Sequence, residues 1–358
     1  MGLIVVQLLL GGDRLAAAGS GSGDERAGDE RPGDELWLVD CRALTTVRAA
    51  TQKVDHRLRA WRYDRAQATW QRQEQAQFLE ATGRVMPTCF WVHGDRVDPD
   101  KSFHIGREVY HQLVADRPAG PPIRFVVWSW PTTKQMHGRP LKDARIKAAR
   151  ADAAGYSLAW VLSACDPDTP VSLLGFSFGA RVVAGAVHLA AGGQLDGYAI
   201  AADRQPAGAY QVVLLAAAMD DQWLLPGKKH GQALQGIRQL LLVNNGQDWV
   251  LKRYHLLKCG NGCQALGYQG LIWPASLPDH EVTVSQMNAG PYIGKQHRWG
   301  PYVYTKPVIT KVRQTILSPP APPLAQPPEK QLRGATRDPA RDPARDQIAT
   351  TGAADERP

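Results

Sequence analysis

One five-residue segment constrains this chain more than any other: Gly-Phe-Ser-Phe-Gly at 175–179, between a short apolar run at 171–174 and an alanine-rich apolar stretch at 178–191. The apolar run predicts a strand, and the alanine-rich stretch predicts a buried helix. The flanking glycines allow a sharp turn at this junction and let the helix pack on a neighbouring strand without a Cβ clash. Such a turn lifts the Ser177 hydroxyl above the sheet and points the backbone donors of the helix at it.

The rest of the central chain alternates in the same way. Apolar runs typical of strands are separated by segments with helical spacing, of which 102–115 and 141–163 are the clearest. This alternation predicts βαβ units and a mostly parallel sheet with helices on both faces. The predicted strands are 36–41, 88–92, 123–128, 171–174, 212–217, 239–243 and 281–286, and a hairpin is predicted from 58–63 and 68–72.

A nucleophilic serine needs a base, and the base needs a carboxylate that orients it. Where a serine follows a strand in this way, the chain order is serine, acid, histidine. Asp248 lies five residues beyond the predicted strand 239–243 and is the favoured acid. Asp220 and Asp221, just after an earlier predicted strand, remain alternatives.

The base has to come from the histidines, of which five follow Ser177. His297 is favoured, because it lies in a glycine-bounded loop eleven residues after the last predicted strand, where an imidazole can reach over the sheet edge. The other four fall in predicted helices, in a lysine-rich loop or before the last strand: His188, His230, His255 and His280.

An oxyanion formed by attack on a carbonyl needs two hydrogen-bond donors. The first is the backbone N–H of Phe178, where the helix begins. The second is expected from the loop after strand 88–92, which reads HGDR at 93–96, and is the backbone N–H of Asp95. A carboxylate facing the oxyanion would oppose its charge, so the Asp95 side chain is expected to turn away, towards Arg96. The alternative is that these two residues are only a surface ion pair.

With these segments in this order, the chain resembles the α/β-hydrolase superfamily over roughly residues 36–317. The resemblance rests on Val-His-Gly at 92–94, GFSFG at 175–179, and the loops around Asp248 and His297. It is closest to uncharacterised bacterial serine hydrolase-like members that contain WSWP, L-G-x-S-F-G-A-R and N-x-x-D-x-V-L-K segments.

The resemblance implies an α/β-hydrolase fold with a mostly parallel sheet and, since no long helical insertion occupies 218–238, no large lid domain. It implies Ser177 as nucleophile, His297 as base and Asp248 as acid. Asp95 departs from the common pattern, in which an apolar residue or Asn stands there. The implied activity is that of a serine hydrolase, first of all a carboxylic-ester hydrolase working through an acyl-enzyme. The alternative is a catalytically weak or inactive scaffold of the same fold that binds a partner.

Tryptophan is abundant, with eleven residues, and several lie near the predicted site. Their side chains favour an apolar pocket for an acyl or leaving group, although they could equally cover the core. These residues are Trp128, Trp130, Trp223, Trp249 and Trp299.

Low-complexity segments border the central domain, 36–317. The N-terminal segment is 1–35, of which residues 19–35 are Gly/Ser-rich and then repeat Gly-Asp-Glu-Arg. The Pro-rich residues 318–358 are predicted to be a disordered tail, because neither composition can bury a core. No basic residue precedes the N-terminal apolar stretch, which favours a cytoplasmic protein over a secreted one. No apolar run is long enough to span a membrane.

The net charge and the cysteine content limit the kinds of ligand that this chain is expected to bind. The net charge is +8; residues 1–35 carry −4 and residues 318–358 carry zero, so the centre carries about +12. No basic stripe interleaved with aromatic residues is present, so a small ester or acyl substrate is expected rather than nucleic acid. Cys259 and Cys263 frame a glycine-rich turn, and their spacing could hold a disulfide or half of a metal site. Because no second Cys/His pair follows nearby, plain thiols are favoured, and no metal or cofactor is expected.

Overall fold

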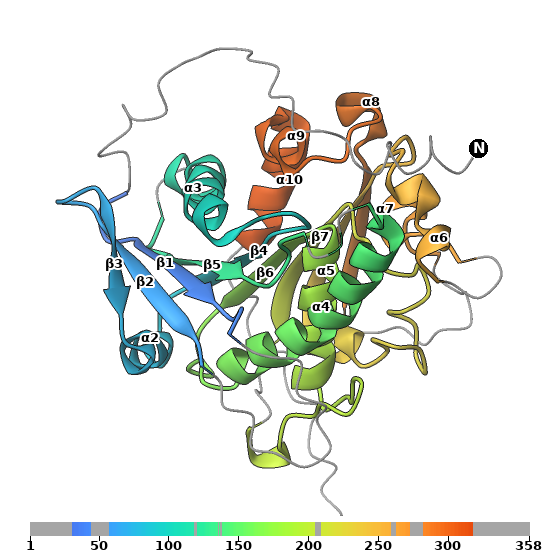
Figure 1. Cartoon of the computed structure of the whole chain (residues 1–358). Helices are drawn as coiled ribbons and strands as arrows, with labels where there is room; N and C mark the ends of the chain where they lie inside the picture. Colours follow the sequence, from blue (N-terminus) through green and yellow to red (C-terminus); the bar gives the residue numbers. More distant parts are fainter. Residues whose placement is uncertain are drawn as a thin grey trace, which may run out of the picture. The chain divides into compact units, whose positions relative to one another are not determined.

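A computed structural model describes residues 31–43, 57–117, 120–134, 136, 138–204, 209–258, 263–272 and 282–317. The described residues form a nine-stranded sheet in the order β3-β2-β1-β5-β4-β6-β7-β8-β9 (Figure 1). Its strands are β1 (Glu35–Asp40), β2 (Arg59–Asp64), β3 (Thr69–Gln73), β4 (Thr88–Val92), β5 (Arg124–Ser129), β6 (Val171–Phe176), β7 (Tyr210–Leu215), β8 (Ile237–Asn244) and β9 (Thr283–Asn288).

The sheet is mostly parallel. The β2–β3 hairpin is antiparallel and joins β1 in an antiparallel pair, whereas all other neighbouring strands run parallel. The carboxyl ends of the seven parallel strands of the described sheet therefore meet at one edge, where the loops after β4, β6, β8 and β9 gather.

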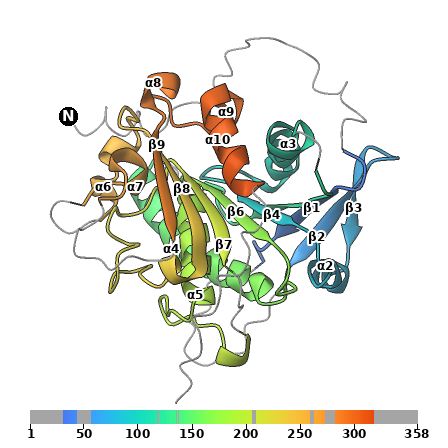
Figure 2. The same ribbon diagram turned by 180° about the vertical axis from the view of Figure 1, so that it is seen from behind.

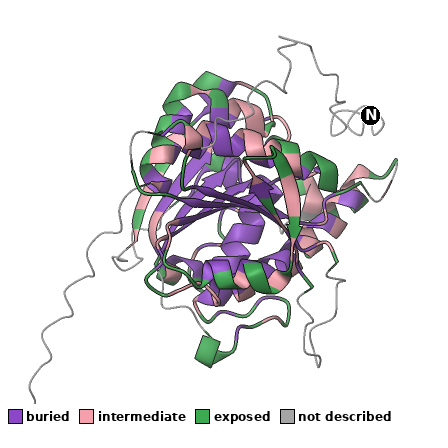
Figure 3. Cartoon of the chain, turned by 90° about the vertical axis from the view of Figure 1, so that its left-hand side faces the viewer, coloured by how far each residue is buried: buried purple, intermediate pink, exposed green. Residues whose placement is uncertain are grey.

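Helices cover both faces of the sheet (Figures 2 and 3). α4 and α5 pack together on one face, and α3 and α10 cover the other. The helices are α2 (Gln75–Thr82), α3 (Pro99–Tyr110), α4 (Pro140–Leu162), α5 (Phe178–Ala190), α6 (His255–Lys258), α7 (Leu266–Gln269), α8 (Gly290–Ile293), α9 (Trp299–Tyr304) and α10 (Lys306–Ile316). A π-helical stretch, His111–Ala115, continues α3, and 3₁₀ turns lie at Ala202–Arg204, Ala233–Gly236 and Leu251–Arg253.

The covering helices explain why the central strands are buried along their whole length. β1, β4, β5, β6 and β7 are buried at every position, whereas the edge strands β3 and β9 have no buried position. A parallel strand covered on both faces has no solvent side to which polar residues could alternate.

The predicted fold class is confirmed: the described residues form a mostly parallel central sheet flanked by helices. Each predicted strand is present within a few residues of its expected bounds. Residues 216–236 form turns and one 3₁₀ helix, so no lid domain stands there, as expected. Helix α2 and the C-terminal helices α8, α9 and α10 were not predicted.

The folded domain begins earlier in the chain than residue 36, the N-terminal boundary that the composition suggests. β1 begins at Glu35, and the Asp34 side chain is buried in an ion pair with Arg117. Both acidic residues had been assigned to the low-complexity segment, so that segment contributes to the core at its end. Residues 1–30, residues 318–358, Cys259 and His280 lie outside the described residues.

The cysteines differ from expectation at one position. Cys263 is disulfide-bonded, so the prediction of a plain thiol there is wrong. Cys41, Cys89 and Cys165 are free, and burial raises the pKa of the Cys89 and Cys165 thiols to about 12. Within the described ranges, no cluster of three potential metal-ligating His, Cys, Asp or Glu residues occurs, and no helix is long and apolar enough to cross a membrane.

Candidate active site

The turn between β6 and α5 holds Ser177 in a strained conformation, with φ +55° and ψ −119°. The flanking glycines are required by close backbone approach. A Cβ on Gly175 would lie 2.6 Å from the carbonyl oxygen of Gly179, and a Cβ on Gly179 would lie 2.1 Å from that of Val92. Strain of this kind persists only where the surrounding structure imposes it, and it is concentrated at functional sites.

A continuous chain of hydrogen bonds leads away from Ser177. Its Oγ lies 2.9 Å from His297 Nε2, and His297 Nδ1 lies 2.6 Å from Asp248 Oδ2. Asp248 is fully buried, and its other carboxylate oxygen accepts the backbone N–H groups of Val250 and Leu251 at 2.9 and 3.0 Å. Those two bonds fix the carboxylate, so Asp248 can in turn fix the orientation of the imidazole.

The alternative acids have other partners. Asp220 Oδ1 accepts the backbone N–H of Gln222 at 3.1 Å, which caps the following turn. Asp221 is buried beside Asp220, and burial, with a contribution from that neighbour, raises the pKa of Asp221 to about 6. Among the described residues, the carboxylate that bonds His297 is that of Asp248.

The alternative histidines also lie elsewhere. His188, inside α5, is positioned by the Gln194 carbonyl at 3.0 Å and by the N–H of Gln232 at 3.1 Å. His230 is fully buried against the edge of Trp223, and His255 is exposed at the start of α6. The structure therefore brings together the three residues predicted for the site and leaves the described alternatives outside it.

The two backbone N–H groups predicted as oxyanion donors belong to the start of α5 and to the loop after β4. The N–H of Phe178 begins α5, where no earlier helical carbonyl can accept it. The loop after β4 packs against the same turn, since a Cβ on Gly94 would lie 2.8 Å from the Phe176 ring. The next peptide N–H, that of Asp95, donates no hydrogen bond to any described residue.

The Asp95 carboxylate is paired with a residue that the sequence did not suggest. Asp95 Oδ1 lies 2.6 Å from Nζ of Lys147, a fully buried residue of α4. The guanidinium of Arg96, the expected partner, is farther away, with 3.7 Å between its Nε and Asp95 Oδ2, whereas the Arg96 backbone N–H donates to Asp95 Oδ1 at 2.8 Å. No sequence signal marks Lys147, because it lies 52 residues from Asp95 on a helix with many charged residues.

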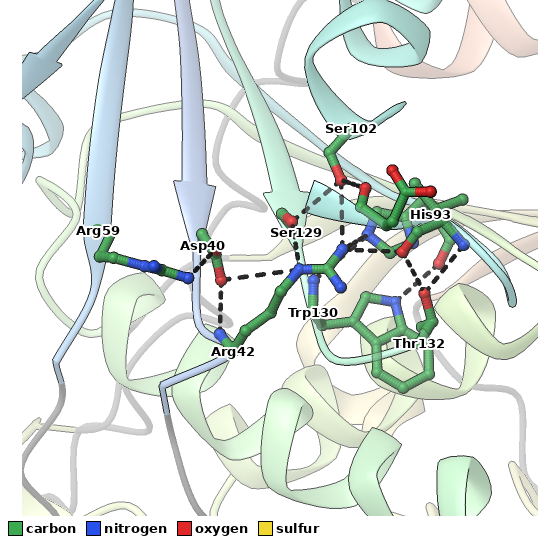
Figure 4. A network of polar contacts seen from close by, with 10 residues as sticks. Asp40, Arg42, Arg59, His93, Ser102, Ser129, Trp130 and Thr132 are labelled. Carbon is green, nitrogen blue, oxygen red and sulfur yellow. Dashed lines mark hydrogen bonds and ion pairs between the residues drawn. The ribbon is translucent and has the colours of Figure 1, made fainter. Parts of the chain in front are cut away.

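His93 is a second residue that the sequence did not assign to the site (Figure 4). Its Nδ1 lies 2.9 Å from the Gly94 carbonyl oxygen, which can only accept, so Nδ1 carries the proton. Nε2 then accepts from the N–H of Trp130 at 3.3 Å and faces the Arg42 guanidinium at 3.4 Å. Burial, assisted by the Arg42 charge, lowers the pKa of His93 to about 3, so its ring is neutral.

The arrangement around His93 fixes one peptide plane. The carbonyl of Gly94 and the N–H of Asp95 belong to the same peptide and point in opposite directions. When His93 holds the carbonyl, it directs the N–H the other way. Arg42 is itself anchored, because its guanidinium donates to Ser129 Oγ at 3.1 Å and to the Val97 carbonyl at 3.0 Å (Figure 4).

An aromatic ring packs against the histidine of the site, and further aromatic rings follow it in the chain. Phe176 lies 5.3 Å from the His297 ring and 5.6 Å from that of Tyr302. Trp299 is half-buried and contacts the exposed ring of Tyr304 at 6.2 Å.

The expected tryptophan pocket needs a correction. Trp128 and Trp130 are fully buried, and the Trp130 ring stacks on His93. They belong to the core and not to an open pocket. Trp223 is half-buried and lies under the side chains of Arg181 and Lys229, whereas Trp249 is half-buried beside Arg253.

Neither a family model nor a curated protein matches the sequence. Solved structures that are similar in backbone at low identity include the following three. An inhibited esterase B from Lactobacillus rhamnosis is 14% identical, with 82% of this chain and 89% of that chain covered and a TM-score of 0.35. Acyl-protein thioesterase 2 from Zea mays is 18% identical, with 65% of this chain and 95% of that chain covered and a TM-score of 0.35. Carboxyl esterase 2 from Tuber melanosporum is 12% identical, with 77% of this chain and 89% of that chain covered and a TM-score of 0.35.

Proposed function

We propose that the protein is a serine hydrolase that cleaves carboxylic esters through an acyl-enzyme. The observation that carries this proposal is the unbroken chain of hydrogen bonds from Ser177 through His297 to the buried Asp248. A serine hydroxyl is a weak nucleophile until a positioned base takes its proton. The three side chains come from the ends of β6 and β8 and from the loop after β9, so the fold itself assembles them.

In the proposed reaction, Ser177 Oγ forms a bond to the ester carbonyl carbon while its proton moves to His297 Nε2. The tetrahedral intermediate collapses, the bond to the leaving oxygen breaks, and His297 returns the proton to that oxygen. Water then repeats the sequence on the acyl-enzyme and releases the acid. Asp248 accepts a hydrogen bond from Nδ1 throughout and stabilises the imidazolium.

The backbone N–H groups of Phe178 and Asp95 are the proposed oxyanion donors. Phe178 contributes the positive end of α5 as well as its own N–H. His93 orients the peptide that contains the second donor. Donors fixed in advance stabilise the developing charge without reorganisation, and the loss of one donor costs about 10²–10³-fold in rate.

The substrate side of the site is proposed to be apolar. Phe176 lies beside His297, and Trp299, two residues further along the chain, contacts the exposed ring of Tyr304; these rings suit an acyl chain or an apolar leaving group.

The test is hydrolysis of nitrophenyl esters from acetate to laurate, together with matched thioesters, by wild type and Ser177→Ala. We expect turnover of at least one ester and a loss of roughly 10⁴–10⁶-fold in the variant. Ser163→Ala is the control, because this hydroxyl bonds the Trp160 carbonyl at the far end of α4 and should not affect the rate. Equal rates for wild type and Ser177→Ala would refute the proposal, and a wild type inactive on every ester and thioester would favour a non-catalytic scaffold.

A further inference from the structure

A buried lysine lies beside the loop that carries the second proposed oxyanion donor. Lys147, near the start of α4, has no exposed surface. Its Nζ lies 2.6 Å from Asp95 Oδ1 and 2.6 Å from Asp143 Oδ2. An ammonium group taken out of water is costly unless it is paired, so these two carboxylates account for the charge at this position.

The two carboxylates belong to different parts of the fold. Asp143 lies one turn before Lys147 on the same helix, and its other oxygen accepts the N–H of Met136 at 3.0 Å, so it serves the start of α4. Asp95 belongs to the loop after β4, which packs against the nucleophile turn. Lys147 therefore ties α4 to the loop that carries the second proposed oxyanion donor.

The position of Asp95 poses an electrostatic problem that Lys147 solves. A carboxylate next to a developing oxyanion repels it, and water screens the Asp95 side chain, which is 26% exposed, only in part. Arg96 offers only weak compensation, since its Nε is 3.7 Å away and its side chain is 37% exposed and therefore screened. The ammonium of Lys147 is nearer and wholly buried, so its attraction for the carboxylate is screened much less.

We propose that Lys147 is a positioning residue of the oxyanion hole: it holds the Asp95 carboxylate against α4 and cancels its charge, which leaves the Asp95 N–H free to stabilise the oxyanion. This inference rests on the proposed esterase function. His93 fixes the carbonyl side of the same peptide, and Lys147 fixes the side chain that follows it.

The test uses the full chain, an ester that wild type hydrolyses, and a comparison of two rescue variants. Lys147→Met is expected to lower kcat by about 10- to 100-fold, with KM changed by less than roughly threefold. Adding Asp95→Asn should restore most of kcat, because no charge then needs cancelling. Adding Asp143→Asn to Lys147→Met should not restore kcat, although the carboxylates of Asp95 and Asp143 both lie 2.6 Å from the Lys147 ammonium. Asp143→Asn alone should keep the wild-type kcat.

The outcomes separate a positioning role from a purely structural one. Unchanged kcat in Lys147→Met, or equal rescue by Asp143→Asn and Asp95→Asn, would overturn the proposal. If thermal melting shows that Lys147→Met does not fold, Lys147→Gln, which keeps a hydrogen-bond donor without the charge, replaces it in the same comparison. If neither folds, the double variant Lys147→Met/Asp95→Asn decides, with kcat within about tenfold of wild type expected and a larger loss contradicting the proposal. An inactive wild type would instead refute the proposed function itself, before any variant is compared.

Discussion

His297 Nδ1 lies 2.6 Å from Oδ2 of Asp248, a carboxylate that is fully buried and whose other oxygen is held by two backbone N–H groups. This contact joins residues 49 positions apart, from the ends of two neighbouring strands. It accounts for the tautomer of His297 that can accept a proton from Ser177, because Nδ1 must carry a hydrogen to donate to the carboxylate.

Asp248→Asn is expected to lower kcat by roughly 10³–10⁴-fold with little change in KM, because an asparagine favours the wrong tautomer of His297. Asp220→Asn and Asp221→Asn, measured on the same ester, should each cost less than about tenfold. A larger loss from either of these than from Asp248→Asn would reassign the acid while leaving Ser177 and His297 in place.

Gly179→Ala is expected to destabilise the fold by about 1–3 kcal/mol or more, because its methyl group would lie 2.1 Å from the Val92 carbonyl oxygen. The movement needed to relieve that contact would also separate the two oxyanion donors and reduce activity. Urea denaturation and ester turnover measure the two effects. Gly246→Ala is the control, because its nearest neighbour would be an ordinary contact at 3.8 Å. Equal stability of the two variants would show that the close approach at the elbow is not required.

Asp34→Ala is expected to cost about 3–5 kcal/mol, because it leaves the Arg117 guanidinium buried without its carboxylate. Glu108→Ala, which removes a solvent-accessible partner of His104 at 3.9 Å, should cost less than about 1 kcal/mol. Urea denaturation of the full chain measures both. For the same reason, a chain trimmed to begin at residue 36 should be less stable than one that begins at residue 31. Equal stability of the two point variants would contradict the assignment of Asp34 to the core.

The raised pKa of Asp221, about 6, predicts a pH-dependent stability. The folded state favours the protonated Asp221 carboxyl over the ionised one. The contribution of this group to the free energy of unfolding is therefore complete below its pKa in the unfolded chain, about 4, and is lost as the pH rises through about 6. Asp221→Asn should therefore raise Tm relative to wild type more at about pH 8 than at about pH 5. The exposed Asp168→Asn is the control and should show no such difference. A constant difference between wild type and Asp221→Asn at both pH values would contradict the shift.

The elbow at Ser177 was predictable because its constraints are local: a strand, two glycines and a helix follow one another within the sequence. The order of the parallel strands helped with His297 and Asp248, since strand ends that follow one another meet at one edge. The pairing of Lys147 with Asp95 was not predictable, because a charged residue on an amphipathic helix is usually solvated, and only the packing of α4 buries it. Trp128 and Trp130 illustrate the same limit, since a strand-end tryptophan in the sequence can face either the site or the core, and only the packing around His93 places them inside.

The central claim is that Ser177 is a nucleophile activated by His297. The most direct measurement is the intact mass of the protein after exposure to a fluorophosphonate, followed by identification of the modified peptide. Wild type is expected to gain one phosphonyl adduct, located on Ser177, and Ser177→Ala is expected to gain none, while the exposed hydroxyls elsewhere stay unmodified because no base activates them. An unmodified wild type, or an adduct that persists in Ser177→Ala, would contradict the claim.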